Sequence, residues 1–79
     1  MQAGLLWFDS EPSRSTVVKA TAAAERFEEK YGVTPDVCYV SERALKDGEM
    51  SIPFREGKLR LVPASNMLVN HFWIGRNDG

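Results

Sequence analysis

The stretch STVVKATAAAERFEEKYG, residues 15–32, decides the fold of this chain. Its apolar residues recur three and four positions apart, so they fall on one stripe of an α-helix. That stripe consists of Val17, Ala20, Ala24, Phe27 and Tyr31, with Val18 and Thr21 on its flanks. Most charged residues of the stretch fall on its other sides. The pattern therefore predicts one amphipathic helix that buries a single face.

Both ends of this helix carry recognisable signals. Ser13 or Ser15 can cap its first turn, because a serine hydroxyl accepts a hydrogen bond from a free backbone N–H. Gly32 suits the left-handed residue that follows a helix, and Pro35 prevents continuation.

Two short apolar runs flank the helix. Residues 4–8, GLLWF, read as a strand buried on both faces, and residues 37–40, VCYV, are typical of a second strand. A strand, a helix and a strand joined by tight connections predict a right-handed β-α-β unit with a parallel strand pair.

The second half of the chain predicts a short helix and a hairpin. Ser41 can cap a helix over 42–48, ERALKDG, which Gly48 ends. Apolar residues then alternate on both sides of a turn expected at Glu56-Gly57. This turn sets Phe54 opposite Leu59 and Ile52 opposite Leu61. Pro53 lacks an N–H for the ladder, which places the first arm at the edge of the sheet.

A last strand is expected at about 70–75. Together these elements predict an α+β fold, or a small α/β fold, in one globular domain over 1–79. One main helix packs on a mixed sheet of four to five strands, which begins with a β-α-β unit and continues with a hairpin. The order of the strands does not follow from the sequence.

Composition narrows the function classes. The 79 residues have a formal charge of -1, so no long-range field favours nucleic acid or an anionic membrane as a partner. Cys38 is the only cysteine and His71 the only histidine, which predicts neither an internal disulfide nor a metal site nor a cofactor. The opening residues resemble neither a signal peptide nor a membrane span, so a cytoplasmic location is expected.

His71 lies in the sequence HFWIG, where a strand would point it and Trp73 to one face and Phe72 and Ile74 to the other. No flanking residue supplies the partner that a catalytic or metal-binding histidine needs. We therefore expect the ring to pack beside Trp73 or at the rim of the sheet and to bond to a backbone carbonyl. No catalytic residue is predicted here.

One helix can cover only one face of a sheet, yet the strands carry apolar side chains for two faces. Two side chains from residues 5–8, together with Trp73 or Phe72, should remain on the uncovered face. Contiguous exposed apolar patches mark interaction sites. The sequence thus predicts a non-catalytic protein-protein interaction or assembly module, such as a homodimer, with Trp7, His71 and Trp73 in the interface.

An alternative function starts from residues 9–15, which lead from the first strand into the helix. Phosphate sites often form at such joints, so a small hydrolase or an anion-binding or ligand-binding protein could use Asp9, Ser13 and Arg14 there, with His71 as a further candidate. The competing interpretation assigns these residues to a turn and a helix cap. We favour that interpretation and expect a protein without enzymatic activity.

Overall fold

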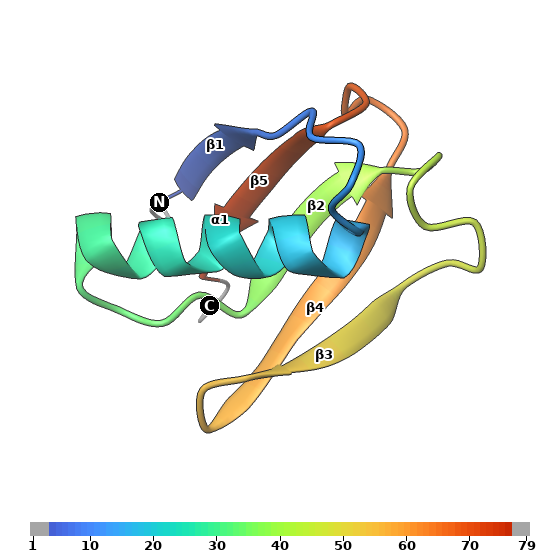
Figure 1. Cartoon of the computed structure of the whole chain (residues 1–79). Coiled ribbons are helices and arrows are strands. Elements are labelled where there is room, and N and C mark those ends of the chain that lie inside the picture. Colours follow the sequence, from blue (N-terminus) through green and yellow to red (C-terminus); the bar gives the residue numbers. More distant parts are fainter. Residues whose placement is uncertain (1–3, 77–79) are drawn as a thin grey trace.

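A computed structural model describes residues 4–76 as one helix packed on one face of a five-stranded sheet (Figure 1). The elements in chain order are β1 (Gly4–Phe8), α1 (Thr16–Tyr31), β2 (Val37–Ser41), β3 (Met50–Phe54), β4 (Gly57–Ala64) and β5 (His71–Gly75). The predicted α+β architecture, with a β-α-β start and a later hairpin, is confirmed.

The signals read at both ends of α1 act as predicted. Ser15 is the N-cap, and its hydroxyl oxygen accepts a hydrogen bond of 3.1 Å from the backbone N–H of Val18. Gly32 follows the helix with φ 72°, and its N–H donates to the carbonyl of Glu28 at 2.8 Å. A side chain at that left-handed backbone would be strained, which explains the glycine.

The strand order β1-β5-β2-β4-β3 corrects one expectation. β1 and β2 run in the same direction but are not paired, because β5 lies between them and is antiparallel to both. The parallel pair of the sheet is β2 with β4. β5 carries apolar side chains on both faces, and such strands belong in the interior of a sheet rather than at its edge.

The hairpin of β3 and β4 is confirmed, with a register shifted by two residues. Ile52 pairs with Leu59, and the turn consists of Arg55 and Glu56 instead of Glu56-Gly57. A shift of two keeps every side chain on its predicted face, because side chains alternate with period two. Arg55 adopts φ 55°, and its guanidinium forms an ion pair of 2.6 Å with Glu28 of α1. β3 is an edge strand, as Pro53 predicted.

Residues 42–48 do not form the predicted short helix. They make consecutive turns, in which the N–H groups of Ala44 and Gly48 donate to carbonyls three residues earlier. Ser41 still caps this segment, since its hydroxyl oxygen accepts from the N–H of Arg43 at 3.2 Å. Gly48, with φ 93°, ends the second turn.

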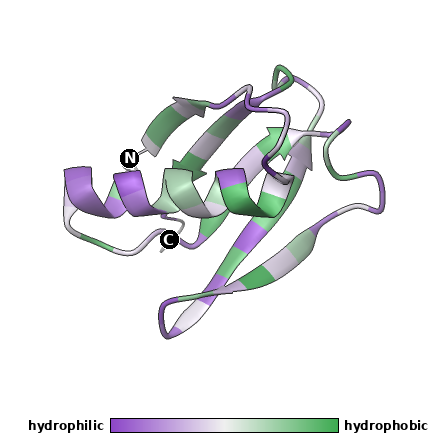
Figure 2. Cartoon of the chain, in the orientation of Figure 1, coloured by the Kyte–Doolittle hydropathy of each residue, from purple (hydrophilic) through white to green (hydrophobic). Residues whose placement is uncertain are grey.

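The core lies between α1 and the face of the sheet that α1 covers. Hydropathy alternates along β4, and its hydrophobic residues Leu59 and Leu61 are fully buried (Figure 2). The helix contributes Ala20, Ala23, Ala24 and Phe27, all without solvent exposure. Small alanines let the helix approach the sheet closely, and Phe27 fills the space that remains. The sheet and the turn after β2 contribute the other members of the core cluster: Cys38, Val40, Leu45, Ile52, Phe54, Phe72 and Ile74. Leu5 and Trp7 pack against this cluster.

Candidate interaction surface

The face of the sheet opposite α1 carries a row of apolar side chains. Leu6 pairs with Trp73 and Phe8 with His71 across β1 and β5, and Tyr39 of β2 is the other neighbour of Trp73. Directly paired residues point to the same face of a sheet. The open-face cluster is therefore defined as Leu6, Phe8, Tyr39, Val62, His71 and Trp73.

Much of this cluster is exposed to solvent. Leu6 and Phe8 are each 57% exposed and Trp73 is 38% exposed. The expectation that residues 4–8 are buried on both faces was therefore wrong: only Leu5 and Trp7 pack on the core. An edge strand beside a single helix has no second layer to cover its other side.

The His71 ring is fixed at one end of the cluster. Its Nδ1 donates a hydrogen bond of 3.0 Å to the carbonyl of Val69, and its centroid lies 4.8 Å from that of Phe8. The predicted hydrogen bond to a backbone carbonyl is confirmed, although the aromatic neighbour at this distance is Phe8. Leu68 and Val69, in the turn before β5, are 70% and 50% exposed.

The Trp73 indole lies across Gly4, at the start of β1. A Cβ atom on Gly4 would overlap the six-membered part of that ring. Glycine at this position lets the indole lie close to the sheet rather than stand away from it. The orientation of Trp73 within the open-face cluster thus depends on the missing side chain of Gly4.

The free edge of β1 adds backbone hydrogen-bonding groups to this surface. The N–H of Asp9 donates a hydrogen bond of 3.0 Å to the carbonyl of Asn70, the residue before β5. Residues that bond to the neighbouring strand alternate with residues that point outward, so Leu6 and Phe8 direct their N–H and C=O groups away from β5. Gly4 shares this direction, and its carbonyl accepts from the Tyr31 hydroxyl at 2.8 Å.

The opposite edge of the sheet is built differently. β3 contains Pro53, which pairs with Lys58 of β4. Proline has no N–H to donate to a further strand. Arg60, opposite Ser51, forms an ion pair of 2.7 Å with Glu49. Proline and charged side chains are common protections of an exposed edge.

The structure separates the three residues predicted for the interface. His71 and Trp73 lie on the open face, whereas Trp7 points to the helix side, beneath the Arg26 guanidinium at 5.7 Å. Its Nε1 is buried and has no hydrogen-bond partner within residues 4–76. Tyr39 and Val62 were missed, although alternation along residues 37–41 and 57–64 would have placed them on this face.

The loop of residues 9–15 brings together the residues of the alternative site, but their side chains bond to one another within the loop. Arg14 forms an ion pair of 3.1 Å with Asp9, and the Ser13 hydroxyl donates to Glu11 at 2.7 Å. The Glu11 N–H, followed by Arg14, lowers the pKa of Asp9, and Ser13 lowers the pKa of Glu11. Two carboxylates against one guanidinium make this loop a poor site for an anion.

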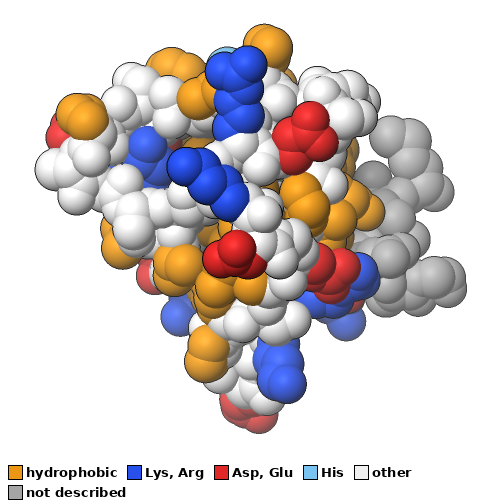
Figure 3. Space-filling view, turned by 90° about the vertical axis from the view of Figure 1, so that its right-hand side faces the viewer, with side chains coloured by type: hydrophobic (Ala, Val, Ile, Leu, Met, Phe, Trp, Pro, Cys, Tyr) orange, Lys and Arg blue, Asp and Glu red, His pale blue; other side chains and the backbone are white. Residues whose placement is uncertain are grey.

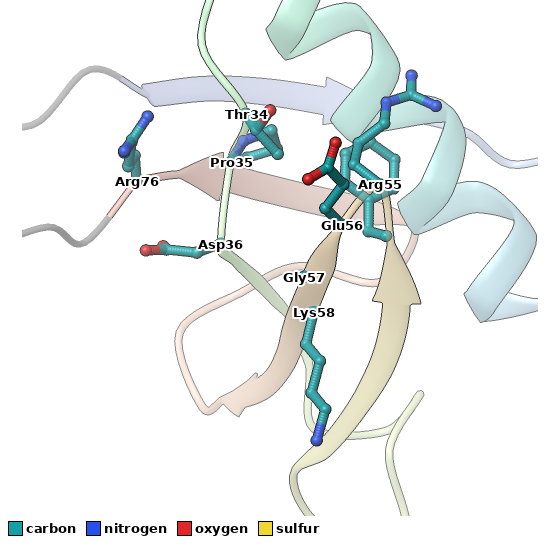
Figure 4. Close-up of a pocket in the computed structure, with 9 residues that line it drawn as sticks. Thr34, Pro35, Asp36, Arg55, Glu56, Gly57, Lys58 and Arg76 are labelled. Atoms are coloured by element: carbon teal, nitrogen blue, oxygen red, sulfur yellow. The ribbon is translucent and has the colours of Figure 1, made fainter.

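A broad depression of about 560 Å³ lies at the tip of the β3-β4 hairpin (Figure 4). Its side chains diverge: Arg55 and Lys58 point in opposite directions, and Asp36 and Arg76 lie on the far side. The charges are mixed and Arg55 is already paired with Glu28. This arrangement does not bring reactive groups together.

The thiol of Cys38 is predicted to be unreactive in the folded protein. Burial raises the pKa of its thiol to about 12, so hardly any thiolate is present at pH 8. A thiol-reactive dye should therefore label the native protein slowly and the urea-unfolded protein fast. Fast labelling under native conditions, at a rate independent of urea, would contradict the buried position of Cys38.

Within residues 4–76, no three His, Cys, Asp or Glu side chains are grouped as metal ligands. The helix in this part of the chain is too short and too polar to span a membrane. Comparison with known proteins found no matching family model, no similar curated protein and no similar solved structure.

Proposed function

We propose that this protein is a non-catalytic self-association module, which forms a homodimer by packing the open-face cluster of one copy against that of another. The observation that carries the proposal is the contiguous apolar surface from Leu6 to Trp73, which α1 leaves uncovered. Monomeric proteins rarely expose patches of this kind, because their burial against a partner is favourable.

A second copy of the chain suits this surface better than a charged partner. The centre of the cluster carries aromatic and aliphatic side chains, with Leu6, Phe8, Tyr39 and Trp73 as neighbours. Such a patch is complementary to itself, which is what a two-fold interface requires. The formal charge of -1 gives little repulsion between copies. Two sheets can then pack face to face, about 10 Å apart, with their side chains interdigitated.

Leu6→Lys is expected to shift the dimer to monomer. Leu6 is largely exposed in the single chain, so lysine should leave the fold intact, whereas in the dimer it would bury a charge without a partner. Sedimentation equilibrium from micromolar to millimolar protein measures the dissociation constant. We expect it to rise about tenfold or more, the equivalent of about 1.4 kcal/mol.

Val18→Lys is the matched control, because Val18 is 50% exposed on α1, outside the open-face cluster. It should leave the dissociation constant unchanged. A wild-type chain that stays monomeric at millimolar concentration, or an equal effect of both lysines, would refute self-association through this face.

A further inference from the structure

A small cavity of about 110 Å³ opens at the end of the molecule where α1 begins. Figure 3 views this end and shows Lys and Arg side chains near its middle, among apolar and acidic ones. The cavity lies between the first turn of α1, the end of β2 and the start of β5. Its polar lining includes Thr16, Lys19, Ser41, Arg43 and Asn70.

Lys19 is the unusual member of this lining. It is only 7% exposed, and its Nζ donates a hydrogen bond of 3.3 Å to Oδ1 of Asn70. In residues 4–76 no carboxylate is close enough to form an ion pair with it. The single neutral oxygen of Asn70 uses only one of the three N–H donors of this ammonium group, and an opposite charge close to it would be favourable.

The lining contains a second positively charged residue, Arg43, and no negatively charged one. Asp9 accepts hydrogen bonds from the Glu11 N–H and from Arg14, which lower the pKa of its carboxyl; the charge of Lys19 adds a smaller contribution. Asp9 does not line the cavity. In a chain of net charge -1, a cavity with two cations and no carboxylate is a local exception.

Hydroxyl donors complete the arrangement. Ser41 is 5% exposed, and its oxygen accepts from the Arg43 N–H. Its hydroxyl proton has no acceptor within residues 4–76, so it can be donated to a ligand. Thr16 is the first residue of α1, where the helix dipole adds partial positive charge. The volume is well above the roughly 10–15 Å³ that holds one water, so a small ion fits, while a larger molecule would extend outside.

We infer that this cavity binds a phosphate group, held by the Lys19 ammonium and the Arg43 guanidinium with the hydroxyls of Ser41 and Thr16. Donors arrive from α1, from β2 and from the turn after β2. That spread suits a tetrahedral oxyanion, which offers oxygens in several directions, better than a planar carboxylate. The phosphate is inorganic phosphate or the end of a phosphomonoester whose remainder lies outside the cavity. This inference is independent of self-association.

The test titrates the full-length protein with orthophosphate and, separately, with glycerol phosphate, at constant ionic strength. Two-dimensional NMR should show saturable shifts at Thr16, Ser41 and Arg43. A response to both ligands identifies a general phosphate site, and a response to the ester alone identifies a phosphomonoester site. No saturable response to either would overturn the inference.

Lys19→Met keeps the aliphatic stem and removes the charge. We expect it to weaken phosphate binding about tenfold or more, because a charge-assisted hydrogen bond is lost. In phosphate-free buffer the same variant should be at least as stable as the wild type, since it no longer buries an ammonium group without an anion. A purely structural lysine would give the opposite result: lower stability, with phosphate binding unchanged.

Lys30→Met is the control, because Lys30 is an exposed lysine of the same helix, outside the cavity. It should bind phosphate as the wild type does. Arg43→Gln, an exposed position at the cavity, provides a second variant whose folding is not in question. Equal binding by wild type, Lys19→Met and Arg43→Gln would assign any phosphate response to another part of the surface.

Discussion

Phe27→Ala is expected to cost about 3–5 kcal/mol of the free energy of unfolding, the cost of removing a fully buried aromatic side chain. A domain of 79 residues is stabilised by about 4–12 kcal/mol in total. Phe27 is the only large residue among the fully buried side chains that α1 contributes, beside three alanines that cannot expand into the space it leaves. The loss is therefore a large share of the total stability, and the variant should unfold at a much lower urea concentration than the wild type.

Urea denaturation followed by circular dichroism measures this effect, at one protein concentration, because dimer formation adds apparent stability. Val18→Ala is the control on the exposed side of the same helix and should change the unfolding free energy by less than about 0.5 kcal/mol. A loss below about 1 kcal/mol for Phe27→Ala would mean that α1 does not dock on the sheet through this ring.

Gly4→Ala is the second large effect, at about 1–3 kcal/mol of lost stability. The added methyl group would overlap the Trp73 indole, so the ring has to rotate away from the sheet. In a Trp7→Phe background, in which Trp73 is the remaining tryptophan, its fluorescence emission should move to longer wavelength as the indole becomes more exposed.

A double-mutant cycle tests the cause of that loss. If the indole is what the methyl group meets, Gly4→Ala should cost little in a Trp73→Ala background, where the ring is absent. The same cost in both backgrounds would place the strain in the backbone of β1 rather than in its contact with Trp73.

Local signals predicted the parts of the fold that local interactions determine. Ser15 and Gly32 act within the first and last turns of α1, and they fix its two ends. The apolar stripe relates residues only three or four positions apart. Pro53 likewise placed β3 at an edge, since a proline cannot donate to a strand on both sides. Hydrophobic alternation gave the correct faces of the hairpin.

The hairpin register and the structure of residues 42–48 were not predictable, because in each case two conformations fit the local sequence about equally well. Registers two residues apart give the hairpin the same faces, and Gly57 favoured the wrong turn because glycine tolerates a left-handed backbone, a conformation that Arg55 adopts instead. The segment 42–48 has helix formers but closes as turns, because so short a helix gains little from propensity alone.

The sequence predicted that one apolar face of the sheet stays exposed, but it identified only some of the residues on that face. The excess of apolar strand residues over what one helix can cover is visible in the sequence, and Trp73 was assigned to the open face. Trp7 lies on the helix side instead, because period two fixes which residues share a face but not which face the helix covers. The cavity around Lys19 gave no sequence signal, since it joins residues about fifty positions apart.

The two edges of the sheet differ in whether they can accept a strand from another chain. Within residues 4–76, no strand pairs with the outer edge of β1, where Leu6 and Phe8 direct their backbone groups, so a strand can be added there. Pro53 blocks addition beside β3. Two copies joined along β1 would leave the β3 strands as the outer edges, so strand addition by itself ends at a pair.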